Sequence, residues 1–345
     1  MPLFLWYTEL DNLRAMPPMT TANAPGKIIV FGEHAVVYGR PAIAVPVTQV
    51  QAQVTIEQGE EGQGIVIVAR DLGRILMVGE GETNDVVSPL QTVVASTLEY
   101  LGLGLEHDLT ITIESTIPIA RGLGSGAAVS TAMIRALAGY FARELTGQEV
   151  SGLVYEAETL YHGTPSGIDN TVIAYERPVY FIRDQKLETF CVRKPLLFLI
   201  ADTGLESPTK TVVGAVRQAW ERSKDRYEAL FDSVGDVAVR ARRALEKGEV
   251  EQVGRLMDEN HRLLQTMGVS SFELDALVEA ARHTGALGAK LSGAGRGGNM
   301  IALVTPQTCE RVKDALEKEG AQSVIQTGVE ASTDLTPSLV PERER

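Results

Sequence analysis

Apolar residues follow two different spacings along the chain, and each spacing predicts a different kind of element. Short apolar runs and strict alternation of apolar and polar residues are typical of buried and half-exposed strands. They occupy residues 28–31, 50–80 (as antiparallel strands), 107–116, 195–204 and the end of 289–304. Spacing by three and four residues, typical of amphipathic helices, occupies residues 89–100, 209–247, 250–267 and 273–284. The pattern therefore predicts a chain that contains both strands and helices.

A glycine-rich turn at residues 118–135, PIARGLGSGAAVSTAMIR, joins the strand at 107–116 to an Ala-rich helix. Such a turn exposes backbone N–H groups at a helix N-terminus, where the helix dipole favours negative charge. The turn lacks the Gly-Lys-Ser/Thr ending of a P-loop, so it is not an ordinary Walker site. Glycine-rich turns also allow a helix to pack close to a sheet, and this structural role stays open beside phosphate binding.

Other polar residues lie where apolar runs begin or end. Lys27, Glu33 and His34 flank the run at 28–31, either as surface residues of a hairpin or as functional residues at strand ends. Asp169 lies between a Gly/Pro/Ser turn and an apolar run, so we expect a buried, oriented carboxylate there, although isolated acidic residues are mostly solvated.

A second glycine-rich turn lies within residues 289–304, AKLSGAGRGGNMIALV, and taken alone it is explained by a tight hairpin. Two such turns, a lysine, and the carboxylates of Glu158 and Asp169 are together the parts that phosphoryl transfer requires. That reaction needs donors around the phosphates, oxygen ligands for Mg²⁺, and a carboxylate that orients or deprotonates the attacking hydroxyl.

The composition of the chain limits the classes of partner and the cellular compartment that we expect for the protein. The chain has 345 residues, enough for two domains, and a formal net charge of −13, which disfavours a broad nucleic-acid surface. Cys191 and Cys309 are far apart, which favours a reducing cytoplasm, and no apolar run approaches transmembrane length. Residues 1–20 are expected to be an extension outside the fold, with Met16 or Met19 as a hypothetical start, and residues 332–345 a polar tail.

Four motifs in order carry a family resemblance. They are APGKIIVFGEHAVVYG at 24–39, PIARGLGSGAAVS at 118–130, HGTPSGIDN at 162–170 and KLSGAGRGGNMIAL at 290–303. The chain resembles the GHMP kinases over roughly residues 22–330, and within that family it is most similar to the members that phosphorylate mevalonate.

The resemblance implies an α+β fold of two domains, residues 21–193 and 194–331, with the active site in the cleft between them. It implies ATP- and Mg²⁺-dependent conversion of (R)-mevalonate to 5-phosphomevalonate in isoprenoid precursor biosynthesis, in the cytoplasm, with a possible homodimer and neither nucleic acid nor membrane as a partner. The alternatives are another small-molecule kinase of the family, acting on phosphomevalonate or a sugar, a related decarboxylase, or an inactive nucleotide-binding sensor. The His-Ala-Val-Val-Tyr-Gly run at 34–39 favours mevalonate over galactose.

Roles follow from the resemblance position by position. Asp169 would be the general base, with Lys27 beside it, and Lys27, Asp169, Glu33 and His34 would position the substrate. Ser125 and Glu158 would hold Mg²⁺. The expected ATP-binding residues are Pro118, Arg121, Gly122, Leu123, Gly124, Ser125, Gly126, Ala127, Gly293 and Gly295, with Gly297 and Gly298 in the same second loop.

Two positions depart from the family pattern. Gly126 stands where many members have a second serine, which leaves Ser125 or water to supply the hydroxyl ligand. Arg296 replaces a glycine of the last motif, and its side chain is expected either to approach the phosphates or to point into solvent.

Overall fold

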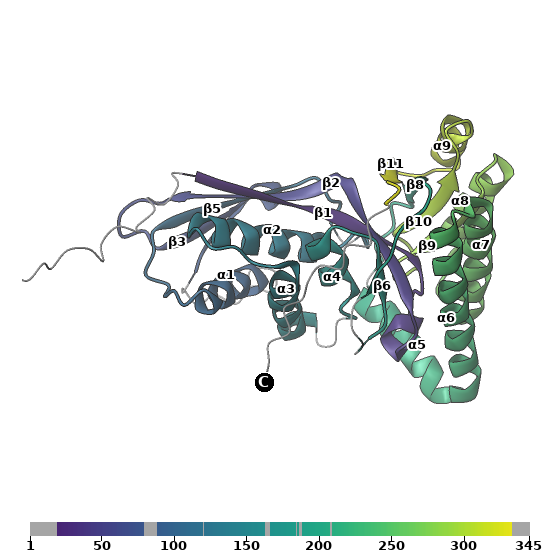
Figure 1. Ribbon diagram of the computed structural model, residues 1–345, viewed down its shortest axis with the longest axis horizontal. Helices are drawn as coiled ribbons and strands as arrows, with labels where there is room; N and C mark the ends of the chain where they lie inside the picture. Colours follow the sequence, from purple (N-terminus) through teal and green to yellow (C-terminus); the bar gives the residue numbers. More distant parts are fainter. Residues whose placement is uncertain are drawn as a thin grey trace, which may run out of the picture.

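Two β-sheets, each with its own group of helices, lie end to end along the long axis of the molecule (Figure 1). The computed structural model describes residues 19–78, 88–119, 121–162, 166–183, 185, 188–207 and 209–332. Strands up to Thr189 form the first sheet, and strands from Leu196 onward form the second. The mixture of helix and sheet is the α+β class that the resemblance implied.

The first sheet has seven strands in the order β4-β3-β5-β2-β6-β7, with β1 paired to β2. These strands are β1 (Met19–Phe31), β2 (Ala42–Gln58), β3 (Ile65–Ala69), β4 (Arg74–Met77), β5 (Leu109–Ser115), β6 (Val179–Phe181) and β7 (Glu188–Thr189). Alternation at 50–80 predicted antiparallel strands, which is correct for β2 and for the β3–β4 pair, but β3 also pairs with β5 in parallel. Alternation reports only which face of a strand is buried, and therefore does not fix strand direction.

One face of this sheet is covered by four helices (Figure 1). They are α1 (Ser88–Tyr100), α2 (Ser125–Tyr140), α3 (Gly147–His162) and α4 (Ile168–Tyr175). The small buried residues Ala128, Ala132 and Ala136 let α2 pack closely on β1 and β2. The predicted core residues of this helix are confirmed as buried, and they are Ala127, Ala128, Met133, Ile134 and Leu137.

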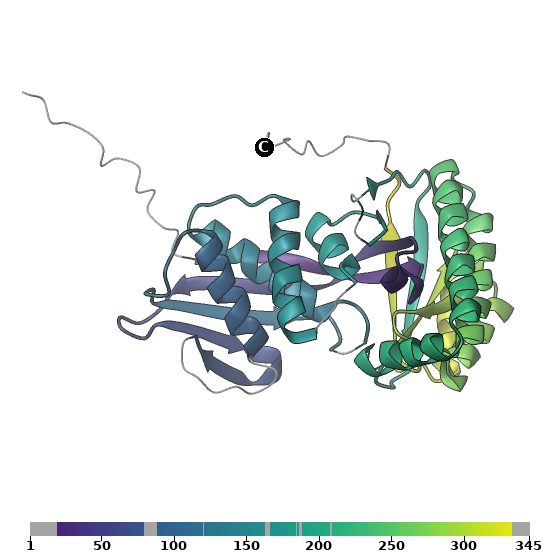
Figure 2. The same ribbon diagram turned by 90° about the horizontal axis from the view of Figure 1, so that it is seen from below.

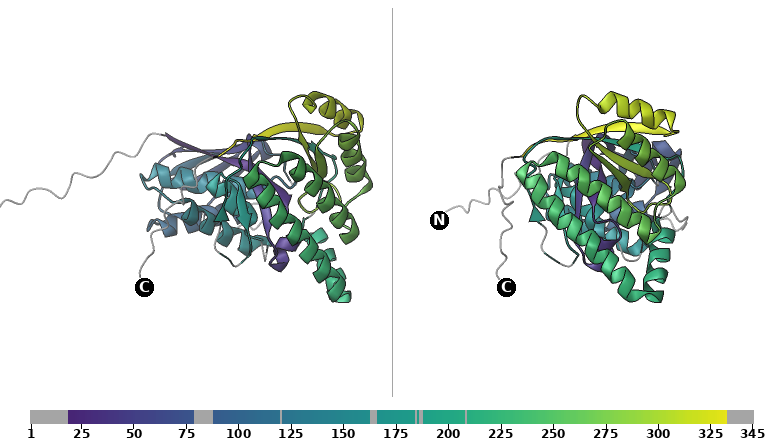
Figure 3. Two further views of the ribbon diagram at one scale, coloured as in Figure 1. Left: turned by 45° about the vertical axis from the view of Figure 1, so that its right-hand side comes forward. Right: turned by 90° about the vertical axis from the view of Figure 1, so that its right-hand side faces the viewer.

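The second sheet has the order β11-β8-β10-β9, and all its pairs are antiparallel. Its strands are β8 (Leu196–Asp202), β9 (Gly288–Ser292), β10 (Asn299–Val304) and β11 (Ser323–Val329). Its helices are α5 (Thr209–Arg222), α6 (Lys224–Lys247), α7 (Val250–Met267), α8 (Phe272–His283) and α9 (Cys309–Lys318). Figures 2 and 3 show α6–α8 together on the side of this sheet away from the first one, and α9 beside β11, whereas α5 runs from the lower end of α6 back toward the first half (Figure 1).

The helical pattern at 209–247 is two helices rather than one, because the chain leaves helical geometry at Ser223 (φ −144°, ψ 60°). The Ser223 side chain makes no capping hydrogen bond with the described residues, and Asp225 supplies a favourable negative charge in the first turn of α6. The indole N–H of Trp220 donates to Glu228 across this break. The periodicity alone carried no sign of the break.

The expectation about the N-terminal end of the chain needs correction, and the expectation about the C-terminal tail concerns residues outside the described ranges. The first predicted unit, residues 1–20, extended too far, because Met19 and Thr20 already pair with Glu57 and Ile56 of β2. Residues 1–18 and 333–345 lie outside the described ranges. Of the helices within those ranges, none is both long and apolar enough to cross a bilayer.

Candidate active site

A buried lysine and a partly exposed aspartate meet between β1 and α4. The Nζ atom of Lys27 lies 3.0 Å from Oδ1 of Asp169, and the side chains are 4% and 33% exposed. Lys27 lies on β1, and Asp169 is the second residue of α4, which begins after Gly167 in a left-handed conformation (φ 84°). The pair therefore presents a carboxylate with open surface, held by a cation whose stem is buried.

The N-terminal glycine loop (residues 121–127) adjoins this pair. The backbone N–H of Lys27 donates to the Leu123 carbonyl over 2.9 Å, which fixes the loop to β1. Within α2 the first intrahelical bond runs from Ala128 N–H to Gly124, so the N–H groups of residues 125–127 have no partner inside the helix. Those N–H groups at the positive end of α2 are the expected anion cradle.

Gly124 is required for steric reasons as well as for its backbone angle. Its φ is +75°, and a Cβ there would lie 2.9 Å from Cδ1 of Ile173 and 3.0 Å from Cγ of Lys27. Any larger residue would therefore push the stem of Lys27 away from Asp169.

Glu158 contributes a second carboxylate to the same region from α3. Asn170, next to Asp169, donates from Nδ2 to the carbonyl and hydroxyl oxygens of Ser151, which ties α4 to α3. Burial, followed by the negative charge of Asp169, raises the pKa of Glu158 to about 8, while Lys27 acts in the opposite direction. A carboxylate whose charge is disfavoured by burial and by a neighbouring carboxylate is a suitable ligand for a divalent cation.

The donor set fits Mg²⁺, which prefers oxygen ligands and usually keeps phosphate or water ligands as well. Neither the hydroxyl of Ser125 nor the carboxylate of Glu158 makes a hydrogen bond with the described residues, so both oxygens are free to bind a cation. Within the described ranges no three His, Cys, Asp or Glu side chains converge, so a bound cation would depend on substrate oxygens to complete its shell.

The departure at Gly126 leaves room for the missing hydroxyl. A Cβ at this exposed position would meet no heavy atom within 4 Å. We expect Gly126→Ser to fold normally and to lower the KM for MgATP by about two- to twelvefold, since one added hydrogen bond contributes roughly 0.5–1.5 kcal/mol. Steady-state kinetics at varied Mg²⁺ measures this. Gly126→Ala is the matched control, and an equal effect of both changes would contradict a role for the hydroxyl.

Glu33 and His34 lie in a turn that follows β1 and precedes a short 3₁₀-helix, η1 (Ala35–Tyr38). β1 and β2 do form an antiparallel hairpin around this turn, but both residues are buried, so they are not surface residues of it. Gly32 (φ +95°) begins the turn, and a Cβ there would lie 2.5 Å from the Pro41 carbonyl. The Glu33 carboxylate pairs with Nζ of Lys290 and accepts from Asn260 Nδ2 over 3.0 Å. Both carboxylate oxygens of Glu33 are therefore bonded to side chains of the protein itself.

The ring of His34 faces the second half of the chain. Its Nε2–H donates to the Ala294 carbonyl over 2.8 Å. Burial lowers the pKa of His34 to about 4, although this hydrogen bond raises it, so the ring is neutral at pH 7. The residue has φ +62° and ψ −47°, a positive-φ conformation that costs a non-glycine residue energy and that the packing around it must stabilise.

The C-terminal glycine loop (residues 293–298) lies opposite the N-terminal one. A Cβ on Gly293 would be 3.9 Å from Cα of Gly122. Arg296 does not point at this gap: its backbone N–H donates to Val269, and its guanidinium donates to the Gly268 carbonyl over 3.2–3.3 Å. The open question about Arg296 is therefore answered by a contact with the C-terminal end of α7, where a cation is favourable.

Arg121 is also held away from the cradle. Its guanidinium lies 3.4 Å from Asp202 of β8, and its carbonyl accepts from Asn299 Nδ2. Leu123 and Ala127 are buried and Pro118 is half-buried, so side chains at these positions support the loop, and its backbone supplies the donors.

Comparison with known proteins agrees with the four motifs. The GHMP kinases N terminal domain matches residues 89–177, and the GHMP kinases C terminal domain matches residues 241–322. A mevalonate kinase of Thermococcus gammatolerans is 36% identical over 321 residues, covering 88% of this chain and 94% of the relative. The chain belongs to the GHMP kinase family.

Solved structures extend this likeness to three dimensions. L. major mevalonate kinase in complex with R-mevalonate is 28% identical, with a TM-score of 0.79, over 90% of this GHMP kinase and 96% of that chain. The Methanococcus jannaschii mevalonate kinase is 27% identical, with a TM-score of 0.77, over 90% and 98% of the two chains.

Several residues around the site of this GHMP kinase have no distinguishing sequence signal. Lys290 is completely buried although lysines are mostly exposed, and Asn260 lies in a helix whose spacing predicted only amphipathicity. Arg40, just after η1, bonds Glu228 and Asp232 of α6, and Tyr38 stacks on Phe231 with ring centroids 4.1 Å apart. Side chains of α6 therefore anchor the turn that carries Glu33 and His34.

Buried neutral histidines predict acid sensitivity of this kinase. Burial, and then the charge of Arg282, lower the pKa of His261 to about 4, although Asp275 opposes the shift. A folded-state pKa below the unfolded value of about 6.5 means that stability is complete above pH 6.5 and is lost as the pH falls toward 4. We expect His261→Gln to reduce this pH dependence by at most about 3 kcal/mol between pH 7 and 4. Urea unfolding at several pH values measures this effect. If the free energy of unfolding of the variant depended on pH as steeply as that of the native protein, the assignment to His261 would be wrong.

Proposed function

We propose that the protein transfers the γ-phosphoryl group of ATP to the primary hydroxyl of (R)-mevalonate and so produces 5-phosphomevalonate for isoprenoid precursor biosynthesis. The Lys27–Asp169 pair carries this proposal, because it offers a proton acceptor and a cation directly beside the expected phosphate cradle. The names of the similar proteins support mevalonate as the substrate.

Asp169 accepts the proton of the attacking hydroxyl as the O–P bond forms, and the bond from phosphorus to the β,γ-bridging oxygen of ATP breaks. Its exposed carboxylate leaves room for a hydroxyl, and Lys27 favours the negative charge that develops on the attacking oxygen. The N–H groups of residues 125–127 bind phosphate oxygens, and their fixed orientation requires no reorganisation during the reaction.

Ser125 and Glu158 would hold the Mg²⁺ that accompanies ATP. A bound Mg²⁺ supplies charge neutralisation on the phosphate oxygens. The protein's part is to keep two oxygens free of other partners near the α2 N-terminus and to hold α3 against α4 through Asn170 and Ser151.

A substrate panel tests the assignment. Purified protein with ATP and Mg²⁺ is offered (R)-mevalonate, 5-phosphomevalonate, galactose and homoserine, and ADP release is measured with the product identified by mass. We expect (R)-mevalonate to give a kcat/KM at least about 10²-fold above the others, since a site built around one hydroxyl acid rejects analogues lacking its groups. Faster turnover of another alcohol would overturn the substrate, and none with any alcohol would favour a nucleotide sensor.

Assembly and compartment are part of the same proposal. We infer a homodimer in the cytoplasm, supported by the family likeness and by two widely separated cysteines. Light scattering of the purified protein measures the assembly directly, and a monomeric mass at micromolar concentration would contradict the dimer.

A further inference from the structure

Polar side chains from both halves of the chain meet along a line between β1 and β9. Ser292 donates to the Ile29 carbonyl over 2.9 Å, Lys290 pairs with Glu33, and His34 donates to the Ala294 carbonyl. We call these three contacts, together with the hydrogen bond from Asn260 to Glu33, the β1–β9 seam. The four side chains that donate in the seam, together with Glu33, are all buried, with at most 6% of any residue exposed.

The charged centre of the seam is completely enclosed. The side chains of Glu33 and Lys290 are each 0% exposed. Both carboxylate oxygens of Glu33 are satisfied, one by Lys290 and the other by Asn260, and Lys290 also donates to the Leu291 carbonyl over 2.6 Å. Burial lowers the pKa of Lys290, and Glu33 opposes this shift. A buried charge pair contributes little net stability. Losing either partner is nevertheless costly, because it leaves an unpaired buried charge, and so the two side chains must keep their relative positions.

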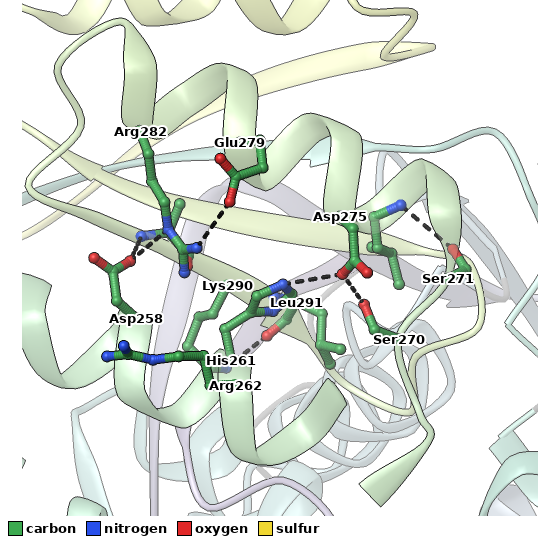
Figure 4. A network of polar contacts seen from close by, with 12 residues as sticks. Asp258, His261, Arg262, Ser270, Ser271, Asp275, Glu279, Arg282, Lys290 and Leu291 are labelled. Carbon is green, nitrogen blue, oxygen red and sulfur yellow. Dashed lines mark hydrogen bonds and ion pairs between the residues drawn. The ribbon is translucent and has the colours of Figure 1, made fainter. Parts of the chain in front are cut away.

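The second-half side of the seam is rigidly backed by α7 and α8 (Figure 4). The N–H of Leu291 donates to His261 Nδ1 over 3.3 Å, so His261 carries its proton on Nε2 and donates it to Asp275. Two residues earlier on β9, the N–H of Ala289 donates to Asp258, which also binds Arg282. Lys290 therefore lies between two backbone positions of β9 that are fixed to α7, and it cannot shift independently.

We propose that Glu33, Lys290 and Asn260 are positioning residues that hold the two glycine loops in the relative placement that phosphoryl transfer requires. On one side the seam continues along β1 to Lys27, whose N–H fixes the N-terminal loop through Leu123. On the other side it continues along β9 into the C-terminal loop, where His34 holds Ala294. This inference rests on the proposed kinase function and adds to it a set of residues that touch neither substrate.

The consequence for catalysis follows from the sensitivity of in-line transfer to distance. A displacement of about 1 Å between reacting groups can cost about 10²-fold in rate. The loops face each other across Gly122 and Gly293, so a slip along the seam changes the relative placement of donors that come from different halves of the chain. Substrate affinity in each half is affected less than turnover.

A double replacement separates positioning from simple stability. Glu33→Met and Lys290→Met singly each leave a buried charge and are expected to lower the melting temperature, while the double variant is expected to regain most of it. The proposal predicts that the double variant keeps kcat at least tenfold below the native value, with the Kd for ATP within about threefold. Wild-type kcat in a stable double variant would overturn it.

A milder variant keeps the test decisive if the double variant does not fold. Ser292→Ala removes one neutral seam contact, and we expect kcat to fall about three- to tenfold at a temperature well below melting. Thr327→Val is the matched control, because Thr327 is equally buried on β11, its hydroxyl has no partner, and it lies outside the seam. Equal kcat for both variants would overturn the proposal.

Amide hydrogen exchange gives a readout that does not depend on activity. The N–H groups of Arg296 and Gly298 donate to the carbonyls of Val269 and Leu205, so in the native protein these amides of the C-terminal loop are protected from exchange. We expect Ser292→Ala to raise exchange there at least fivefold while α1 is unchanged. Unchanged exchange would refute the seam even in an active enzyme, whereas a wild-type protein without kinase activity but with this exchange response would refute only the proposed function.

Discussion

Replacing Asp169 with Asn is expected to lower kcat by about 10³-fold while ATP binding is retained, since general-base catalysis contributes about 10²–10⁴-fold. Asn keeps an oxygen that can accept from Lys27, so the 3.0 Å contact and the start of α4 can both persist. What is lost is the group that accepts the hydroxyl proton. Rapid-quench kinetics with mevalonate, together with calorimetric titration of ATP, measures both quantities.

The matched control for Asp169→Asn is Glu176→Gln, which removes a carboxylate at the opposite end of α4, where Glu176 pairs with Arg135. This control is expected to keep native turnover. If Asp169→Asn also kept native turnover, the base would be a different group, and the pair with Lys27 would serve only to orient the α4 helix.

Glu158→Gln is expected to have opposite effects on activity and stability. The loss of a charged ligand should raise the KM for MgATP or lower kcat by about 10²-fold, as removal of one metal-binding group commonly does. Without Mg²⁺, the same change should raise the free energy of unfolding at pH 8 by about 1–3 kcal/mol. A residue that destabilises the free protein but is needed for turnover is typical of functional sites.

The sign of the stability effect follows from the pKa of about 8. Between the unfolded value near 4.5 and pH 8, the folded protein binds more protons at Glu158 than the unfolded chain does, so stability falls as the pH rises through this window. Urea unfolding in EDTA at pH 5, 6.5 and 8 should show that the free energy of unfolding falls less with rising pH in the Glu158→Gln variant than in the native protein. Glu156→Gln, an exposed position two residues earlier on α3, should match the native protein in both assays. Parallel pH curves for Glu158→Gln and the native protein would contradict the assignment.

Much of the fold was predictable from local patterns. Short apolar runs located β1, β8 and β10, and the Ala-rich segment after the first glycine turn is the helix α2 that packs on the sheet. The parallel β3–β5 pair and the break at Ser223 were missed because neither changes the local spacing of apolar residues.

The candidate site was predictable where residue type is unusual for its neighbourhood. Lys27 and Asp169 were identified at the ends of apolar runs, and the structure brings them into contact. Lys290 and Asn260 were not identified, because a lysine before a glycine turn and an asparagine in an amphipathic helix are ordinary in sequence. Their role depends on Glu33, which is 257 and 227 residues away respectively and reaches them only through the packing of β9 and α7 on β1.

The position of Gly124 has a consequence for how this enzyme can change over time. Its missing side chain makes room for the N-terminal glycine loop to turn and, at the same place, for the methylene groups of Lys27 to pass. A substitution there would therefore disturb the N-terminal glycine loop and the Lys27–Asp169 pair in a single step. Selection could not reshape the loop at this position without displacing the lysine, so evolutionary change in the loop is confined to its other positions.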